Sequence, residues 1–336
     1  MNEQQNLNYS NITGPYFFML DVTSACNFRC LHCYNESGEK NYNDLSNEEL
    51  ADVANQIADF HPESVCLCGG EPMLRSNLID LIQILSPNVG AVNMVSNGSL
   101  INETIVNDLK QAGINIIQIS LDGINPMQHD TFRCHPGAFE MAINALKAIK
   151  SKDIETYVSF IPNKLNYRTF PEFLHLMQSF GVSQVRVMPL IPMGRGSKIE
   201  NLILSSDEYI QLQSMILGLK NKYIRHGLQI EWGDPLDHFN RLPNNETTGY
   251  KNCQYCIKSN GDITITPYLP ITVGNVRKHS LKEYWNNGYD NIWYNKDFKN
   301  TIKSIETIYD INKLYTKLNY NTNNFINIMR EKTDEI

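Results

Sequence analysis

The sequence predicts an α/β protein in which strands and helices alternate around a parallel sheet. Six short apolar runs lie between residues 16 and 188, and each is followed by a segment whose apolar residues have helical spacing. This alternation is typical of a parallel sheet with right-handed crossovers and flanking helices. Each run ends in Cys, Gly, Ser, Asn, Asp or Pro. Because loops at the carboxyl ends of parallel strands build active sites, we expect the functional residues there.

The predicted elements follow in order along the chain. Strands are expected at 16–20, 64–68, 91–95, 116–120, 156–161 and 184–188, and helices at 46–60, 77–85, 103–111, 138–150, 169–180 and 206–225. Ser46 and Glu49 have the spacing of a capping box. After residue 227 come a strand-like run at 228–232, a polar stretch to 249, a predicted hairpin of 261–266 with 271–273, a helix at 280–286 and weak helical periodicity after 302. We therefore predict two domains, 15–226 and 227–336.

The composition is that of a globular protein, with 42% hydrophobic and 19% charged residues. The net charge of −7 argues against a nucleic-acid partner. No apolar run approaches the roughly 20 residues that span a bilayer, so no membrane partner is expected. Residues 1–8 lack the basic and apolar regions of a signal peptide. Eight cysteines without an export signal indicate metal or redox chemistry in a reducing compartment, and we expect a cytoplasmic protein.

Three cysteines follow the first predicted strand with the spacing Cys-x3-Cys-x2-Cys: Cys26, Cys30 and Cys33. A structural zinc site normally has four protein ligands, usually as two separated pairs. A [4Fe–4S] cluster held by three thiolates instead leaves one iron open to another molecule. The alternatives are reduced core cysteines or half of a zinc site; the number three favours the cluster.

The cysteine motif, with His32 before the last cysteine, resembles the signature of the radical SAM superfamily. The resemblance implies that Cys26, Cys30 and Cys33 ligate one [4Fe–4S] cluster whose open iron chelates S-adenosylmethionine (SAM). One electron then cleaves SAM to a 5′-deoxyadenosyl radical, which abstracts hydrogen from substrate. The resemblance also implies a partial (β/α)6 TIM-like barrel over residues 15–226 and an electron donor of the flavodoxin or ferredoxin type.

The resemblance extends to strand-end residues that are expected to hold SAM. The tetrapeptide 69–72, Gly-Gly-Glu-Pro, matches a family motif around the methionyl amino group, although alone it is a weak signal for a tight turn. Arg133 matches an arginine that pairs with the SAM carboxylate; the alternative is a surface arginine on a loop. The other strand-end residues are also ordinary turn residues. The expected set is Gly69, Gly70, Glu71, Asn97, Ser120, Asp122, Arg133, Ser159 and Met188.

Five cysteines lie outside the motif. Cys66 and Cys68 alternate on the second predicted strand and are expected to pack as small hydrophobes, and Cys134 is expected to be a bystander. Cys253 and Cys256 begin a segment that resembles the SPASM or twitch extension of radical SAM enzymes, although no cysteine follows Cys256.

At position 266, where that extension has a cysteine, this chain has Thr266. We therefore expect a small α+β C-terminal extension without the ligands for an auxiliary iron–sulfur cluster. Cys253 and Cys256 are then structural or donate hydrogen to a substrate radical, while zinc or cluster binding stays open.

The function implied is hydrogen abstraction from a peptide or small molecule in a natural-product or cofactor tailoring pathway. Its outcome is epimerisation, oxidation or C–C or C–X bond formation, catalysed by an oxidoreductase or epimerase. Only a short segment precedes the first predicted strand, so no leader-binding domain is expected there. The alternative is a non-catalytic structural or redox-sensing protein that binds a metal or cluster on a decayed barrel. That alternative predicts loss of 69–72, Asp122 or Arg133, and all are present.

Overall fold

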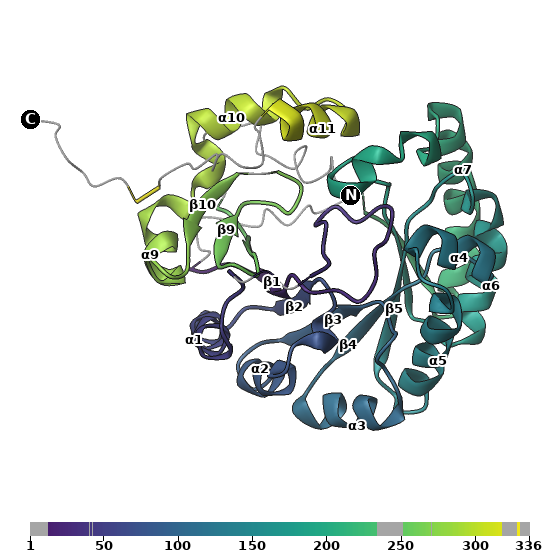
Figure 1. The fold of residues 1–336 in the computed structure, drawn as a ribbon, viewed down its shortest axis with the longest axis horizontal. Helices are drawn as coiled ribbons and strands as arrows, with labels where there is room; N and C mark the ends of the chain where they lie inside the picture. Colours follow the sequence, from purple (N-terminus) through teal and green to yellow (C-terminus); the bar gives the residue numbers. More distant parts are fainter. Residues whose placement is uncertain are drawn as a thin grey trace, which may run out of the picture.

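The computed structural model describes residues 13–39, 41, 43–233, 251–269, 271–317 and 328–329. Ten strands form one sheet in the order β10-β9-β8-β1-β2-β3-β4-β5-β6-β7. The sheet curves into an open barrel, and most helices pack on its outer face (Figure 1). The predicted α/β partial barrel is therefore confirmed.

The six predicted strand–helix units are present within a few residues of their expected bounds. The first seven strands pair in parallel, in chain order. They are β1 (Phe17–Thr23), β2 (Ser64–Gly69), β3 (Ala91–Ser96), β4 (Ile116–Ser120), β5 (Glu155–Phe160), β6 (Gln184–Val187) and β7 (Gln229–Trp232). The helices between them are α1 (Asn47–Ala58), α2 (Leu78–Leu85), α3 (Glu103–Ala112), α4 (Pro126–Arg133), α5 (Ala138–Lys150), α6 (Phe170–Ser179) and α7 (Ser206–Ile224). Helix α4 was not predicted.

Alternate residues of each inner strand face opposite sides of the barrel wall, because side chains along a strand have a period of two. On β2, Val65 and Leu67 are fully buried in the main hydrophobic core. Cys66 and Cys68 instead line the cavity inside the barrel. The expectation that these two cysteines pack as small hydrophobes is therefore wrong, because they occupy the inward positions of β2.

The segment after residue 227 continues the same sheet. Strand β8 (Gln254–Ile257) pairs in parallel with β1, and the predicted hairpin is confirmed as β9 (Asp262–Thr264) with β10 (Thr272–Asn275). Helices α9 (Leu281–Tyr284), α10 (Lys296–Lys303) and α11 (Ile308–Lys317) follow. Most of the predicted polar stretch to 249 lies outside the described residues. The predicted boundary at 226/227 falls between α7 and β7, and β7 still pairs with β6.

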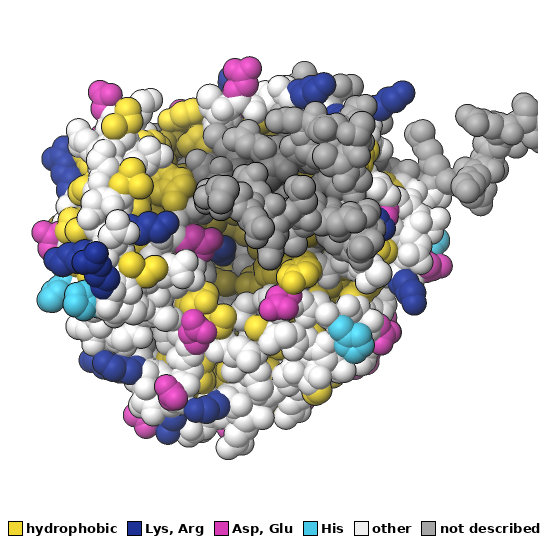
Figure 2. Space-filling view, turned by 180° about the vertical axis from the view of Figure 1, so that it is seen from behind, with side chains coloured by type: hydrophobic (Ala, Val, Ile, Leu, Met, Phe, Trp, Pro, Cys, Tyr) yellow, Lys and Arg dark blue, Asp and Glu magenta, His cyan; other side chains and the backbone are white. Residues whose placement is uncertain are grey.

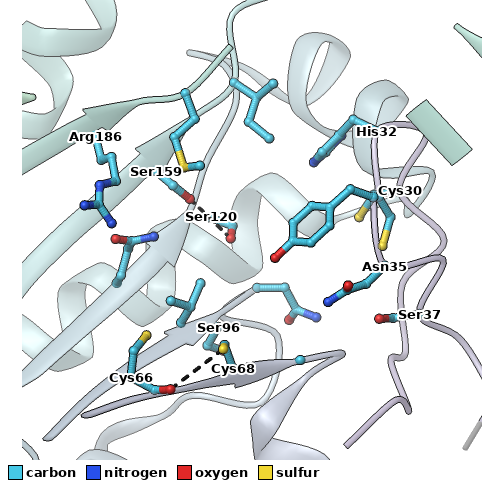
Figure 3. Close-up of a pocket in the computed structure, with 18 of the residues that line it drawn as sticks. Cys30, His32, Asn35, Ser37, Cys66, Cys68, Ser96, Ser120, Ser159 and Arg186 are labelled. Carbon is cyan, nitrogen blue, oxygen red and sulfur yellow. Dashed lines mark hydrogen bonds between the residues drawn. The ribbon is translucent and has the colours of Figure 1, made fainter. Parts of the chain in front are cut away.

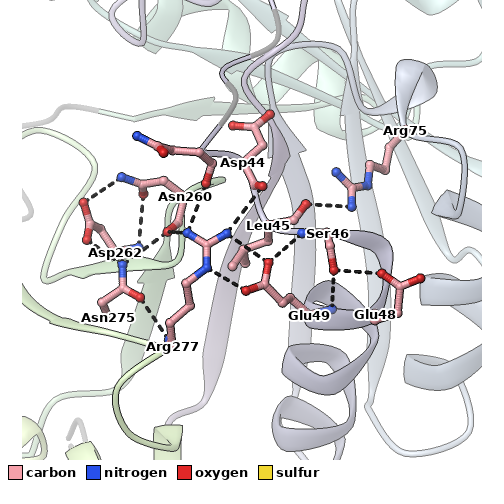
Figure 4. Close-up of polar contacts among 11 residues, drawn as sticks. Asp44, Leu45, Ser46, Glu48, Glu49, Arg75, Asn260, Asp262, Asn275 and Arg277 are labelled. Atoms are coloured by element: carbon pink, nitrogen blue, oxygen red, sulfur yellow. Dashed lines mark hydrogen bonds and ion pairs between the residues drawn. The ribbon is translucent and has the colours of Figure 1, made fainter.

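An ion pair joins this C-terminal hairpin to the first helix of the barrel (Figure 4). Arg277 donates from Nε and Nη2 to the two carboxylate oxygens of Glu49, at 2.6 and 2.9 Å. The Arg277 Nη1 atom also donates to the carbonyl of Asn43. The next residue, Asp44, accepts hydrogen bonds from Ser24 N and Oγ at 2.8 and 2.9 Å. The hairpin is thus fastened to the segment that leads into the cysteine loop.

The opposite face of the molecule has a hollow with hydrophobic side chains on its floor and charged side chains at its edge (Figure 2). Elsewhere on this face acidic and basic side chains are intermixed. Across the residues that the structure describes, no helix combines the length and the apolar character that a membrane span requires.

Candidate functional site

A cavity of about 500 Å³ lies inside the barrel. The cysteine loop that follows β1 forms one wall, and the inward residues of the sheet form the other (Figure 3). All three motif cysteines, Cys26, Cys30 and Cys33, line this cavity. The structure therefore brings together the loop and the strand ends that the sequence pattern placed at one edge of the sheet.

Backbone hydrogen bonds fix the cysteine loop. Cys26 N donates to the carbonyl of Gly38 at 2.7 Å, and Leu31 N donates to the carbonyl of Phe132 at 3.0 Å. Arg195 also holds the loop in place. Its side-chain Nε donates to the Cys30 carbonyl at 2.8 Å, and its backbone N–H donates to the Cys33 carbonyl at 3.0 Å. Sequence reasoning missed Arg195, which lies in a Gly-Arg-Gly turn after the sixth strand.

The three cysteines fit a [4Fe–4S] cluster. All are free thiols, and a small apolar cluster that includes Phe28 and Ala138 packs around them. Burial raises the pKa of Cys30 to about 11, with Arg133 acting in the opposite direction. Because metal ligation requires thiolates, cluster binding at this site releases protons. Among the described residues, no three His, Cys, Asp or Glu side chains converge on a single metal ion. A cluster does not need such convergence, since each thiolate binds a different iron.

The glycines at the end of β2 pack against the start of the cysteine loop. Gly69 has φ +119°, which favours glycine, and a Cβ on Gly70 would lie 2.0 Å from the Ala25 carbonyl oxygen. Both glycines line the cavity. Glu71 is fully buried, and its carboxylate accepts from Ser96 Oγ and Asn97 N, both at 2.8 Å. Glu71 therefore fixes the ends of β2 and β3 relative to each other.

Four further predicted residues line the cavity at neighbouring strand ends: Asn97, Ser120, Ser159 and Met188. Asn97 Nδ2 donates to Asn27 Oδ1 at 2.9 Å, which joins the end of β3 to the cysteine loop. Ser159 Oγ lies 3.5 Å from Ser120 Oγ across β4 and β5. These hydroxyl and amide groups give the rim of the cavity several hydrogen-bonding atoms.

Arg133, the last residue of α4, forms a buried ion pair with Asp122 in the cavity wall. Arg133 Nε and Nη2 lie 2.7 and 2.6 Å from Asp122 Oδ2. Although burial acts to lower it, the Asp122 carboxylate raises the pKa of Arg133. Arg133 lines the cavity, and its Nη1 lies 3.9 Å from Cys30 Sγ. Asp122 is fully buried behind it and thus orients the guanidinium.

His129, also on α4, holds Asp122 from the other side. The Asp122 N–H donates to His129 Nδ1 at 3.0 Å, so the ring proton belongs on Nε2. Burial, with the nearby charge of Arg133, lowers the pKa of His129 to about 2. The ring is therefore a neutral acceptor. The Asn125-Pro126 pair that begins α4 is a capping signal that would have located this helix.

The inward positions of β3 to β7 form a polar layer, in which Gln118 and Tyr157 lie one inward position below Ser120 and Ser159 and Arg186 is in register with Ser159. It contains an ion pair, Arg186 Nε to Glu231 Oε2 at 3.2 Å. Sequence reasoning missed this layer because its side chains lie within strands; alternation along each strand was the available signal. The layer consists of Asn93, Gln118, Tyr157, Gln184, Arg186 and Glu231.

The remaining cysteines lie away from the rim. The carbonyl of Cys253 accepts from Tyr16 N, at the start of β1, so Cys253 is roughly 20 Å along the strand from the cysteine loop. Cys256 is 2% exposed, pairs with Met19 of β1 and does not line the cavity. Cys134 is exposed at the end of α4. Whether Cys253 or Cys256 acts as a hydrogen donor stays a prediction.

Comparisons with known proteins agree with this geometry. The family model of the radical SAM superfamily matches residues 20–177. An AdoMet-dependent heme synthase of Methanosarcina barkeri is 26% identical over 291 residues, 82% of this chain and 83% of the relative. A probable GTP 3′,8-cyclase of Saccharolobus solfataricus is 32% identical over 213 residues, 61% of this chain and 68% of the relative.

Solved structures share the fold at low sequence identity. SuiB of Streptococcus suis bound to S-adenosylmethionine has a TM-score of 0.68 at 17% identity, over 84% of this chain and 68% of SuiB; SuiB bound to precursor peptide SuiA has a TM-score of 0.69. Native anSMEcpe with bound AdoMet has a TM-score of 0.65 at 17% identity, over 87% of this chain and 83% of that protein. This chain belongs to the radical SAM superfamily, whose enzymes use a [4Fe–4S] cluster and S-adenosylmethionine.

Proposed function

We propose that this radical SAM enzyme removes a hydrogen atom from a polar small molecule or peptide segment held inside the barrel. The observation that carries the proposal is one continuous cavity that is lined both by the three motif cysteines and by Gln118, Tyr157 and Arg186. When bound, the reduced cluster supplies the electron that cleaves SAM to methionine and a 5′-deoxyadenosyl radical. The substrate site then lies between the SAM rim and the polar layer.

The roles of the residues follow from their places in the cavity wall. Cys26, Cys30 and Cys33 hold the cluster. Nine rim or supporting residues are assigned to SAM in two groups. Those that line the cavity are Gly69, Gly70, Asn97, Ser120, Arg133, Ser159 and Met188. Glu71 and Asp122 support the SAM site from behind, since their carboxylates are already engaged by the protein.

The polar layer favours a substrate with hydrogen-bonding groups. Asn93, Gln118 and Gln184 present amides, and Tyr157 presents a hydroxyl, within a mainly apolar cavity. A few polar groups in an apolar cavity are typical of a site that orients one ligand. One relative is named a heme synthase and another a probable GTP 3′,8-cyclase, and SuiB and anSMEcpe were solved with peptides. We therefore keep both substrate classes, with epimerisation, oxidation or bond formation as outcomes.

The wider setting is proposed from the same premises. The electron comes from a flavodoxin- or ferredoxin-type donor, and the protein works in the cytoplasm. Residues 15–226 form the barrel domain, and 227–336 form an extension without an auxiliary cluster. The non-catalytic alternative has less support, because a structural or sensing protein needs no cavity beyond its cluster and no Asp122–Arg133 pair at the rim.

The test is anaerobic reconstitution of the wild type beside Cys26→Ala/Cys30→Ala/Cys33→Ala. We expect about four irons per wild-type chain, almost none in the triple variant, and 5′-deoxyadenosine formation only with SAM and a reductant. Cys134→Ser, which changes an exposed thiol outside the cavity, is the control and should keep wild-type iron. Full iron without 5′-deoxyadenosine would contradict the proposal. About eight irons, half of them kept in the triple variant, would show an auxiliary cluster.

A further inference from the structure

Two thiols on β2 face the cavity, below the SAM rim. Cys66 and Cys68 occupy successive inward positions on β2 and both line the cavity (Figure 3). Cys68 precedes Gly70 by two residues, so it lies roughly 7 Å deeper along the strand than the expected SAM contact. Neither thiol is a ligand in the cysteine motif. A substrate placed between the rim and the polar layer therefore lies beside Cys68.

Polar partners hold Cys68 as a neutral thiol. Its Sγ donates to Asp21 Oδ1 at 3.2 Å. The other oxygen of Asp21 lies 3.3 Å from Lys258 Nζ, which also donates to Asn35 Oδ1 at 3.1 Å. The contact with Cys66, then burial and the charge of Asp21, raise the pKa of Cys68 well above its usual range. The sulfur therefore keeps its hydrogen at neutral pH.

A neutral thiol in this position has one evident use in radical chemistry. The S–H bond is weaker than an aliphatic C–H bond, so a carbon radical takes its hydrogen readily. The S–H group is also a weak hydrogen-bond donor, so Asp21 does not prevent it from turning into the cavity. A thiolate at the same place would have no hydrogen to give.

We propose that Cys68 returns a hydrogen atom to the substrate radical, an inference that rests on the proposed function. The S–H bond of Cys68 breaks, a C–H bond forms on the substrate, and a thiyl radical is left on the sulfur. One electron from the flavodoxin- or ferredoxin-type donor and one proton from solvent restore the thiol. The product is then an isomer of the substrate, and each turnover consumes one SAM and two electrons. The reaction class is epimerisation.

The geometry separates Cys68 from the other candidates. Cys253 lies at the opposite end of the strands, and Cys256 does not line the cavity. Cys66 lines the cavity but is roughly 7 Å deeper than Cys68. Cys68 is thus the cavity thiol nearest the rim outside the cysteine motif, within the described residues.

The test uses SAM itself, with no added substrate. Reconstituted protein is freed of thiol reductants, moved into D₂O and given SAM and dithionite. The 5′-deoxyadenosine is then returned to H₂O and its carbon-bound deuterium is measured by mass spectrometry. Protein C–H groups stay unlabelled in D₂O, whereas thiols exchange. Deuterium on carbon therefore reports hydrogen taken from a thiol of the cavity.

We expect deuterated 5′-deoxyadenosine from the wild type, and severalfold less deuterium per molecule from Cys68→Ser and Cys68→Ala. Cys134→Ser should match the wild type. Iron content and melting temperature establish that each variant is folded and loaded. The inference would be overturned by unlabelled product from the wild type, or by labelling in both Cys68 variants that equals the wild-type labelling. Either outcome would leave the proposed function standing. Absence of 5′-deoxyadenosine from iron-loaded wild type would overturn both.

Discussion

Replacement of Gly70 by alanine tests whether β2 holds the cysteine loop in place. A Cβ at Gly70 would lie 2.0 Å from the Ala25 carbonyl oxygen, 2.6 Å from its carbonyl carbon and 2.9 Å from the Ser24 carbonyl oxygen. Cβ contacts under 3.0 Å are essentially never seen, so the Ala25 oxygen must retreat by 3.0 − 2.0 = 1.0 Å. All three atoms are backbone, and no side-chain rotation relieves the clash.

The cost of Gly70→Ala has two parts. Overpacking of this kind costs about 1–3 kcal/mol. The Ala25 oxygen also accepts from Glu71 N at 2.8 Å, and loss of that hydrogen bond adds about 1 kcal/mol. We therefore expect the free energy of unfolding to fall by about 2–4 kcal/mol. Because Cys26 directly follows Ala25, the shift also moves a cluster ligand, and iron per chain should fall well below the wild-type value.

Gly218→Ala is the matched control. Gly218 is an exposed residue inside α7, and a Cβ there meets nothing within 4 Å. Alanine should stabilise the helix by about 0.5–1 kcal/mol and leave the iron content unchanged. The assays are anaerobic urea unfolding and an iron count per chain after identical reconstitution. Wild-type iron and wild-type unfolding energy in Gly70→Ala would refute the reasoning.

Three further substitutions test the polar contacts around the barrel. In the wild type, the free energy of unfolding should fall by up to about 1.4 kcal/mol per pH unit below pH ~6.5, because the folded His129 ring stays neutral to about pH 2 while the unfolded ring protonates. In His129→Gln this contribution to the pH dependence should disappear. Asp122→Asn should cost about 3–5 kcal/mol, because it leaves a buried guanidinium without its carboxylate. Arg277→Ala should cost only about 0.5–1 kcal/mol, since both side chains of its ion pair are over a third exposed. That cost should vanish as the pH falls from about 4.3 towards 2, because the hydrogen bond from Arg277 lowers the pKa of Glu49 to about 2.

Each of these substitutions has a control and an outcome that contradicts it. His175→Gln changes an exposed histidine and should keep the wild-type pH slope, whereas a wild-type slope in His129→Gln would show that the buried ring protonates in the folded protein. Glu231→Gln breaks a partly exposed ion pair and should cost about 0–1 kcal/mol. If Asp122→Asn lowered the free energy of unfolding by no more than Glu231→Gln does, water would have to reach Arg133, which would contradict the prediction. For Arg277→Ala, hydrogen exchange should rise in β9 and β10 before α7, and a uniform rise would contradict a local tie.

The parallel sheet was predictable because each inner strand is apolar on the side that faces the helices. Val65 and Leu67 of β2 are both fully buried, and capping signals such as Ser46 with Glu49 fixed where helices begin. Helix α4 escaped prediction because it has few apolar residues at helical spacing; only Phe132 among its apolar side chains is fully buried. Yet α4 carries Arg133 and His129, so the missed element is one that builds the site.

The site residues were predictable as a set of strand ends but not in their individual roles. Glu71 and Gly70 are neighbours in sequence, but the structure turns Gly70 towards the cavity and buries the Glu71 carboxylate under Ser96 and Asn97. Sequence spacing cannot distinguish these cases, because the direction of a side chain after a strand depends on the turn that follows. The pairing of β8 with β1, which sets the depth of Cys253, is likewise a long-range contact without a local signal.

The depth of each residue along the strands assigns chemistry within the cavity. Glycines, hydroxyls and Arg133 lie at the carboxyl ends, and Cys68 lies one inward position deeper on β2. Gln118, Tyr157 and Gln184 are in register one inward position below Ser120 and Ser159, whereas the Arg186–Glu231 pair is in register with Ser159. A group that must be held rigidly at the rim benefits from the dense backbone hydrogen bonds of the cysteine loop. A hydrogen donor must instead face the substrate and stay out of the cluster, which is what the inward position of Cys68 provides. A thiol at the rim would compete with the motif cysteines for iron, whereas Cys68 lies one inward position below Gly70 on β2.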